Sequence, residues 1–347
     1  MTAYDKPPEL YDGLRLHQNE NTGGCSPRVI EALATLGPED IGFYPPYAAA
    51  SLAIAKYLTV DPSRIALVNG LDEGLMGIAI AYLRSSAGGF VPEAIIPEPA
   101  FEIFRIDTEV VGGRTVRVMP KPDFSFALDA VLAAITVKTR VVFLTNPNNP
   151  TGVSIPLEAV REISRRVPKE AIVFLDEAYA EFSGTTFIPE LAKFPNVIVG
   201  RTFSKAFGLA GIRIGCLVGA PAAMNPIRAA VPVYSVNIAA VVAVQAALTD
   251  MDHVQTYLDQ VRESKTLLYA ACDRLGLKYT KSDANFVLVS AGDRSKALVK
   301  GAAERGVYLR DRSNEPGCAG SIRIATGIVD HTRRCIAVLE EVLCAAQ

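Results

Sequence analysis

The sequence of 347 residues predicts an α/β fold, with a mostly parallel, doubly wound sheet in a large domain and a smaller α+β domain after it. Two observations lead to this prediction. Between residues 64 and 219, short β-rich runs alternate with helical patterns, and several runs are continuously apolar, as strands covered on both faces should be. Beyond residue 250, a long amphipathic helix is followed by strands and helices in mixed order, which is typical of an α+β domain.

The strand candidates of the large domain are short runs rich in Val, Ile and Leu, at residues 64–70, 94–99, 114–120, 140–147, 171–179, 196–202 and 213–220. A helix is expected over 156–167, because Pro156 suits a first helical position. The apolar stretch 233–248 is interrupted by Asn237 and Gln245. It is too short and too polar to span a bilayer, and it predicts a buried helix.

In the C-terminal part, an amphipathic helix is expected over 252–276, with Gly276 well placed for a C-cap. Further elements follow it: strands at 285–291, 306–311 and 321–327, and a last helix from Asp330. The N-terminal part is rich in Pro and Gly, with one helix that opens at Ser26. We expect three units: an N-terminal segment over 1–45 that packs with the small domain, a large domain over 46–245 and a small domain over 246–347.

Composition and charge argue against several classes of function. The formal net charge of −2 gives no support for a nucleic-acid partner, which would need a basic stripe. The first fifteen residues lack the apolar core of a signal peptide, and no membrane partner is expected. The six cysteines form no Cys-x-x-Cys pair and the three histidines are dispersed, so neither a metal site nor a disulfide framework is expected. A cytoplasmic location is the simplest prediction.

Polar residues gather where the predicted strands end, which is where ligands bind in open α/β sheets. They lie in four short stretches: NGLDEGL (69–75), NPNNPTG (146–152), DEAY (176–179) and SKAFGLAGIRIG (204–215). Taken singly, these stretches have ordinary explanations, such as a capped helix start, an Asn/Pro turn, a strand-end acid or a solvated lysine. Taken together, they supply complementary parts for holding an aldehyde cofactor that withdraws electrons.

The chemistry of such a cofactor explains why these residue types occur together. A lysine near other cations loses part of its proton affinity and can form a Schiff base. A buried carboxylate keeps a pyridine nitrogen protonated, so that the ring withdraws electrons. A helix N-terminus, hydroxyl groups and an arginine suit a phosphate dianion. We therefore interpret Lys205 as the amine that traps the carbonyl, with Thr202, Ser204 and Arg213 beside it for the phosphate.

These motifs resemble those of the fold-type I pyridoxal-phosphate aminotransferases, most closely the histidinol-phosphate aminotransferase group. The resemblance runs nearly end to end, from LHQNEN (16–21) to SIRIATG (321–327). It implies pyridoxal 5′-phosphate as the cofactor. Lys205 would form the Schiff base and act as the base for the 1,3-proton shift, and Asp176 would face the pyridine nitrogen. Asn149 and Tyr179 would bind the ring oxygen, and Phe101 would stack on the ring.

The resemblance also assigns residues to the phosphate, the partner subunit and the substrate. The phosphate would be held by the backbone N–H groups of Leu71 and Asp72, together with the side chains of Thr202, Ser204 and Arg213. Tyr44 matches a tyrosine that reaches into the neighbouring subunit's phosphate site, which implies at least a homodimer with shared active sites. Arg310 and Arg323 match two arginines for the substrate's anionic group.

The sequence departs from the family pattern at several positions. Phe43 and Pro46 occur where an arginine and an acidic residue are frequent, and Leu71 follows Gly70 where a small residue is usual. The leading function is transfer of an amino group from L-histidinol phosphate to 2-oxoglutarate, which yields imidazole-acetol phosphate and L-glutamate in histidine biosynthesis. A threonine-phosphate decarboxylase and an aromatic amino-acid aminotransferase are the alternatives. Two further classes are disfavoured. A regulator's sensor module would need a basic DNA-binding segment, and a nicotinamide dehydrogenase would need the G-x-G-x-x-G motif.

Overall fold

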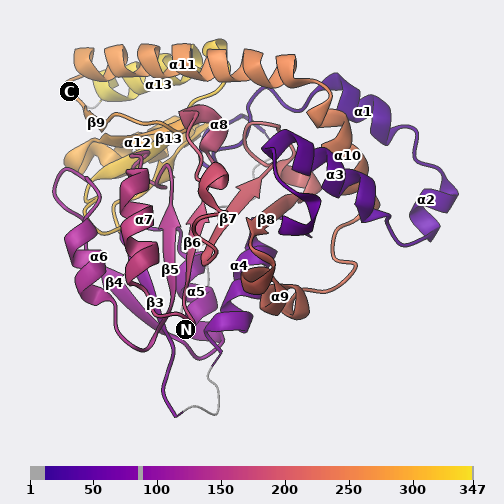
Figure 1. The fold of residues 1–347 in the computed structure, drawn as a ribbon. Helices are drawn as coiled ribbons and strands as arrows, with labels where there is room; N and C mark the ends of the chain where they lie inside the picture. The colour runs from indigo at the N-terminus through magenta and orange to yellow at the C-terminus, as the bar shows by residue number, and fades with distance from the viewer. Residues whose placement is uncertain (1–11, 85–88, 346–347) are drawn as a thin grey trace.

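The computed structural model describes residues 12–84 and 89–345 (Figure 1). Its centre is a seven-stranded sheet in the order β2-β8-β7-β6-β5-β3-β4. The strands are β2 (Ile65–Val68), β3 (Glu93–Pro97), β4 (Arg114–Val118), β5 (Thr139–Thr145), β6 (Ile172–Asp176), β7 (Val197–Thr202) and β8 (Gly215–Gly219). Only β8 runs against its neighbours β2 and β7, and the other pairs are parallel. The predicted α/β class and the mostly parallel sheet are confirmed.

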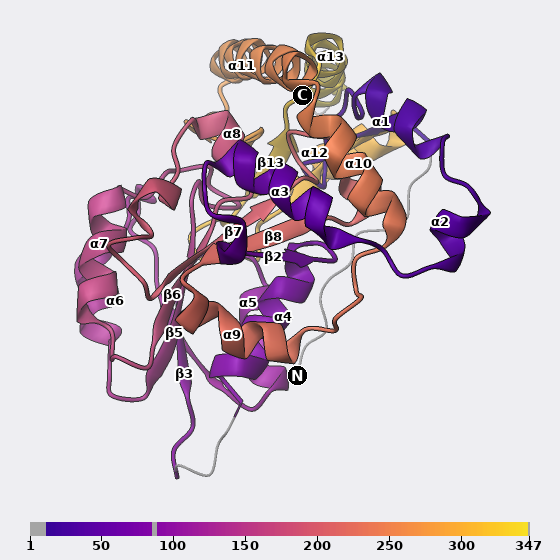
Figure 2. The same ribbon diagram turned by 45° about the vertical axis from the view of Figure 1, so that its right-hand side comes forward.

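Helices cover both faces of this sheet, which explains why its strands are continuously apolar. On β5, Val142 and Leu144 belong to one buried cluster, while Val141 and Phe143 belong to the other, because successive side chains point to opposite faces. The first cluster includes side chains of α3 (Tyr47–Leu58), α6 (Leu128–Ala134), α7 (Leu157–Arg166) and α10 (Ile238–Leu248). The second includes side chains of α4 (Leu71–Tyr82), α5 (Ile103–Val110) and α9 (Pro221–Ala230), which lie together in Figure 2.

The C-terminal part forms a second sheet with its own core. Its antiparallel order is β12-β13-β10-β9, and α11 and α13 run along its outer side at the top of Figure 1. The elements are β9 (Lys278–Thr280), β10 (Phe286–Ser290), β12 (Arg310–Asp311), β13 (Ser321–Ala325), α11 (Met251–Arg274), α12 (Ser295–Glu304) and α13 (Val329–Ala345). Among the described residues, no helix is long and apolar enough to cross a membrane.

The N-terminal segment contacts both cores. A two-residue strand, β1 (Leu14–Arg15), pairs in parallel with β11 (Val307–Tyr308), and Leu14 and Leu16 are buried in the C-terminal core. Further on, α1 (Pro27–Leu33) packs against α10 and buries Val29 in the core of the large sheet. The boundaries 1–45, 46–245 and 246–347 stay a prediction, and residues 1–11 of the first unit lie outside the described residues.

Local differences from the expected elements have simple causes. The stretch 306–311 is divided between two short strands, because β11 pairs with β1 whereas β12 pairs with β13. Pro156 precedes α7 as its N-cap residue instead of opening it. Asn237 is the N-cap of α10, and its side chain accepts a hydrogen bond from the Ala240 N–H at 2.8 Å, so the polar residue starts the helix instead of interrupting it. A short helix that was not expected, α2 (Pro38–Gly42), follows α1.

A buried ion cluster joins the sheet to the helices directly behind the strand ends. Arg201 on β7 forms ion pairs with Glu177, at 3.5 Å, and with Glu181 on α8 (Ala180–Ser183). Tyr57 on α3 donates a hydrogen bond to Glu181 Oε1 at 3.1 Å. Glu177, which is fully buried, also accepts hydrogen bonds of 2.6 Å from the Thr186 hydroxyl and the Phe187 N–H. Burial raises the pKa of Glu177, and Arg201 opposes that shift.

Replacing Glu177 with Ala leaves the Arg201 charge without one of its two buried partners. We expect the free energy of unfolding to fall by about 3–5 kcal/mol, as is typical when one member of a buried ion pair is removed. Urea denaturation followed by circular dichroism measures the change. The matched control is Glu158→Ala on α7, whose carboxylate is 65% exposed beside Arg161 and whose loss should matter by less than about 1 kcal/mol. Equal effects of the two substitutions would contradict the structural role of the cluster.

Candidate active site

A cavity of about 710 Å³ lies where β5, β6 and β7 end. Every residue predicted for the site lines it except Tyr44, so side chains from three distant parts of the chain meet there. The predicted lining residues are Leu71, Asp72, Phe101, Asn149, Asp176, Tyr179, Thr202, Ser204, Lys205, Arg213, Arg310 and Arg323. Within residues 12–84 and 89–345 no group of three or more His, Cys, Asp or Glu side chains could hold a metal ion.

Lys205 lies three residues beyond the end of β7, and its ammonium group is held by the N-terminal segment. Its Nζ donates a hydrogen bond to the main-chain oxygen of Gln18 at 3.0 Å. Desolvation lowers the pKa of Lys205 from 10.5 to about 8, and the positive charges of Arg323 and Arg213 act in the same direction. The lysine is therefore poised to lose its proton only slightly above neutral pH.

Asp176 ends β6 and is almost fully buried at the base of the cavity. One carboxylate oxygen accepts a hydrogen bond from the Ala178 N–H at 2.9 Å. Burial raises the pKa of Asp176 to about 7, although that hydrogen bond and the charge of Lys205 oppose the shift. Such a carboxyl gains its charge most readily when a cationic group lies beside it.

Tyr179 follows Asp176 on the same side of the cavity. Its hydroxyl accepts a hydrogen bond from Asn19 Nδ2 at 3.0 Å, and its ring lies edge-on against Phe286 of β10. Burial raises the pKa of Tyr179, so the phenol remains protonated near neutral pH. The neutral hydroxyl can therefore donate a hydrogen bond to an oxygen atom in the cavity.

The N-terminus of α4 and the loop before β8 form one end of the cavity. Gly70 caps α4 with φ +72°, and a Cβ at this position would lie 2.3 Å from Arg213 Nη2. Arg213 has φ +62° and donates from Nη2 to Asp72 Oδ2 at 3.0 Å. With the hydroxyls of Thr202 and Ser204 nearby in the lining, these donors form a cradle suited to a phosphate group.

Leu71 is accommodated by a glycine on β7. A Cβ on Gly200 of β7 would lie 2.9 Å from Leu71 Cδ1 and 2.6 Å from Phe174 Cζ. Leu71 is buried in the cluster beneath the sheet and also lines the cavity. The larger side chain is thus packed into space that Gly200 leaves open.

Two predicted arginines line the cavity from the small sheet. Arg310 of β12 is the direct partner of Arg323 in the antiparallel register with β13. Arg323 donates to Asn149 Oδ1 at 2.5 Å and to the main-chain oxygen of His17 at 2.7 Å. Like charges directly opposite each other on two strands repel, and an anion bound between them would reduce this repulsion. The pair therefore suits an anionic group.

Phe101 lines the cavity and contacts Phe104 edge-to-face, with ring centroids 6.1 Å apart. Tyr44 lies outside the cavity. Its side chain is 76% exposed, and its ring stacks on Tyr234 at 4.3 Å.

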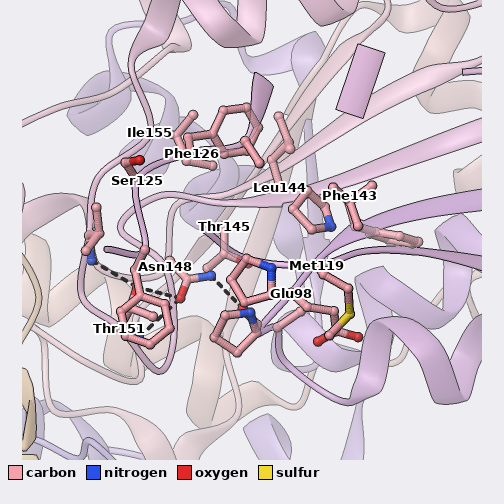
Figure 3. A pocket seen from close by; sticks show the side chains of 18 of the residues that line it. Glu98, Met119, Ser125, Phe126, Phe143, Leu144, Thr145, Asn148, Thr151 and Ile155 are labelled. Carbon is pink, nitrogen blue, oxygen red and sulfur yellow. Dashed lines mark hydrogen bonds between the residues drawn. The ribbon is translucent and has the colours of Figure 1, made fainter. Parts of the chain in front are cut away.

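A second, smaller cavity of about 40 Å³ lies beside the loop that carries Asn149 (Figure 3). Asn148 braces the loop there: its Nδ2 donates to the Pro99 oxygen at 2.9 Å, and its Oδ1 accepts from the Thr151 hydroxyl at 2.8 Å. The mostly apolar wall and small volume leave no room for a cofactor. This cavity therefore belongs to the support of the loop.

Several lining residues were not predicted. The segment His17, Gln18, Asn19 and Glu20 closes over Lys205 and Tyr179, and Arg312 lies in the same wall as Arg310. Burial and the charge of Arg310 lower the pKa of His17 to about 4, so this imidazole is neutral. The spacing of Arg310 and Arg312 was a usable signal, because residues two apart on a strand share a face.

Comparisons with known proteins agree with this geometry. The model of the family "Aminotransferase class I and II" matches residues 11–337. The histidinol-phosphate aminotransferase of Symbiobacterium thermophilum is 35% identical over 338 residues, which cover 96% of this chain and 91% of that protein. That of Akkermansia muciniphila is 35% identical, with 99% and 93% covered.

Among solved structures, the histidinol-phosphate aminotransferase of Sinorhizobium meliloti in complex with pyridoxal-5′-phosphate has a TM-score of 0.86 and 28% identity, and the match covers 97% of this chain and 92% of that one. The chain therefore belongs to the class I and II aminotransferase family, in its histidinol-phosphate aminotransferase group.

Proposed function

We propose that the amine substrate of this aminotransferase is L-histidinol phosphate, with 2-oxoglutarate as the amino-group acceptor. The observation that carries the proposal is the lining of one cavity, which brings together a lysine of lowered pKa, a phosphate-type cradle and a pair of opposed arginines. The family and the names of relatives that cover almost the whole chain support it. A place in histidine biosynthesis and a cytoplasmic location belong to the same proposal.

The cofactor is pyridoxal 5′-phosphate, and the residues present fit it. A side chain at position 70 would clash with Arg213. The donors of the cradle are those that a phosphate dianion needs. When bound, the cofactor supplies an electron-withdrawing ring that stabilises the charge left by a broken Cα–H bond. The residues that would hold its phosphate are Leu71 and Asp72 through their N–H groups, and Thr202, Ser204 and Arg213.

The other lining residues would orient the ring and move the proton. Asp176 would be charged beside a protonated ring nitrogen, and Asn149 and Tyr179 would donate hydrogen bonds to an oxygen. Phe101 would pack against the ring face. Lys205 Nζ would bind the cofactor carbonyl and, once released, would take the proton from the substrate Cα. A pKa of about 8 makes the free amine an effective base near neutral pH.

The substrate's anionic group would bind at Arg310 and Arg323. A phosphate monoester carries nearly two negative charges at pH 7, and planar guanidinium groups bind it bidentately. Two arginines that face each other across β12 and β13 suit this doubly charged group better than they suit a single carboxylate.

Product analysis tests the substrate directly. Purified holoenzyme incubated with L-histidinol phosphate and 2-oxoglutarate should form L-glutamate, and Lys205→Ala should reduce the rate by more than about a thousandfold. Release of CO₂ from threonine phosphate without transamination would contradict the proposal in favour of the decarboxylase. Activity on phenylalanine, with none on the phosphate ester, would contradict it in favour of an aromatic aminotransferase.

The pKa of Lys205 predicts how cofactor capture depends on pH. Because the neutral amine is the nucleophile, the rate at which apoenzyme captures pyridoxal 5′-phosphate should rise with pH and level off above about 8. Stopped-flow absorbance measures this rate. Arg323→Gln removes a positive charge that lowers the pKa, so the midpoint should move upward. A wild-type midpoint near 10.5, the usual value for lysine, would show that the cavity does not perturb this group.

We also propose a homodimer whose two active sites are shared. Support comes from exposed apolar side chains on and directly after α2 and before α10, of which Tyr44 and Tyr234 stack on each other: Ile41, Phe43, Tyr44, Val233 and Tyr234. In both views α2 extends away from the rest of the chain (Figures 1 and 2). Exposed apolar surface is typical of an interface, and Tyr44 would complete the phosphate site of the partner subunit.

Mixing two inactive variants tests whether sites are shared. If Tyr44 acts in the partner's site, a hybrid of Lys205→Ala and Tyr44→Ala subunits has one intact site. Equal amounts of the two, unfolded and refolded together, should then recover about a quarter of wild-type activity, because about half of the dimers are hybrids. Each variant refolded alone is the control. No recovery in a mixture shown to contain hybrid dimers would place Tyr44 in its own subunit's function.

A further inference from the structure

We propose that Arg312 is a third anion-binding residue of the cavity, which holds the phosphate group of the amine substrate together with Arg310. It would make the enzyme favour a phosphate monoester over a carboxylate. This inference deepens the proposed function and rests on it.

The backbone places Arg312 on the same side as Arg310. Successive side chains of an extended chain point to opposite faces, so residues 310 and 312 share one face and Asp311 points away from it. Asp311 is used locally, because its Oδ1 accepts a hydrogen bond from the Ser313 N–H at 2.8 Å. Both arginines line the 710 Å³ cavity, and Arg310 is opposite Arg323 on β13. Three guanidinium groups therefore converge on one wall.

The charge of the cavity leaves room for a multiply charged ligand. Its lining contains five basic side chains, Lys205, Arg213, Arg310, Arg312 and Arg323, against three acidic ones, Glu20, Asp72 and Asp176. Asp72 is already paired with Arg213. The charge of Arg312 also reaches the cavity, since it lowers the pKa of Tyr179. Three of the five basic side chains thus come from β12, the residue that follows it, and β13.

Glu315 holds Arg312 in place but occupies only part of the arginine's guanidinium group. Arg312 Nη1 donates to Glu315 Oε1 at 3.0 Å, and the side chains are only 11% and 13% exposed. Arg312 Nε has no hydrogen-bond partner among the described residues. A guanidinium group carries five N–H donors in a rigid fork, so one carboxylate contact still allows it to present others to a phosphate. Glu315 is therefore a positioning residue that also competes with the substrate for the arginine.

Substitutions of Arg312 and Glu315 should change the KM of the holoenzyme for the phosphate substrate in opposite directions. Arg312→Gln should raise the KM for L-histidinol phosphate at least about tenfold, with kcat changed less than about twofold, and the KM for L-glutamate should rise less. Arg312→Lys should recover part of the loss, because it keeps the charge. Glu315→Gln should lower the KM for the phosphate substrate, because it removes the competing carboxylate. Arg305→Gln, whose side chain pairs with Glu341 outside the cavity, is the matched control.

If Arg312 had only a structural role, the KM values of the variants would change in a different pattern. Loss of the Arg312–Glu315 contact would then affect both variants in the same direction and both substrates equally, and thermal melting would show a shared destabilisation. That result would overturn the inference.

Inhibition by inorganic phosphate separates this inference from the proposed function. In the half-reaction of the holoenzyme with L-glutamate, Arg312→Gln should weaken phosphate inhibition at least about tenfold relative to Arg305→Gln. If the wild type does not use L-histidinol phosphate, the proposed function fails, and the inhibition constants still decide the role of Arg312. An inhibition constant equal to that of the control would overturn it.

Discussion

The buried pairing of Arg201 with Glu177 and Glu181 is the constraint on which the site depends. Glu177 directly follows Asp176, and Arg201 directly precedes Thr202, so the ion cluster fixes the ends of β6 and β7 from behind the cavity. A buried arginine with two carboxylates tolerates little displacement, because any uncompensated charge there is strongly unfavourable. Asp176 and Thr202, which line the cavity, are therefore held in fixed positions.

The front of the cavity is completed by the N-terminal segment, which connects the two cores. Asn19 bonds the Tyr179 hydroxyl through its side chain, and its main-chain oxygen accepts from Asn285 Nδ2 at 3.1 Å. Gln18 holds Lys205, and His17 holds Arg323, both through main-chain oxygens. Since Leu14 and Leu16 anchor this segment in the C-terminal core, any movement of that core relative to the large sheet would be transmitted to Lys205.

Most of the fold could be predicted from the sequence, because strands buried on both faces leave continuous apolar runs such as the one at β5. The strand-end residues could be predicted as well, since a parallel sheet brings strand ends together whatever the loops do. The contacts of His17, Gln18 and Asn19 could not be predicted, because they link residues more than 150 positions apart. Those of His17 and Gln18 are also made by main-chain oxygens, which carry no sequence signal. The division of 306–311 into two strands depends on β1, a partner too short to recognise. Arg312 could have been predicted from its two-residue spacing from Arg310.

The most direct test of the account is to locate the lysine that carries the cofactor. Holoenzyme would be reduced with borohydride, digested and analysed by mass spectrometry, with Lys205→Arg protein treated in parallel. We expect a phosphopyridoxyl group on Lys205 and none in the variant. A modification on another lysine, or an unmodified Lys205 in protein that contains bound cofactor, would contradict the assignment of Lys205 and the reading of the cavity built around it.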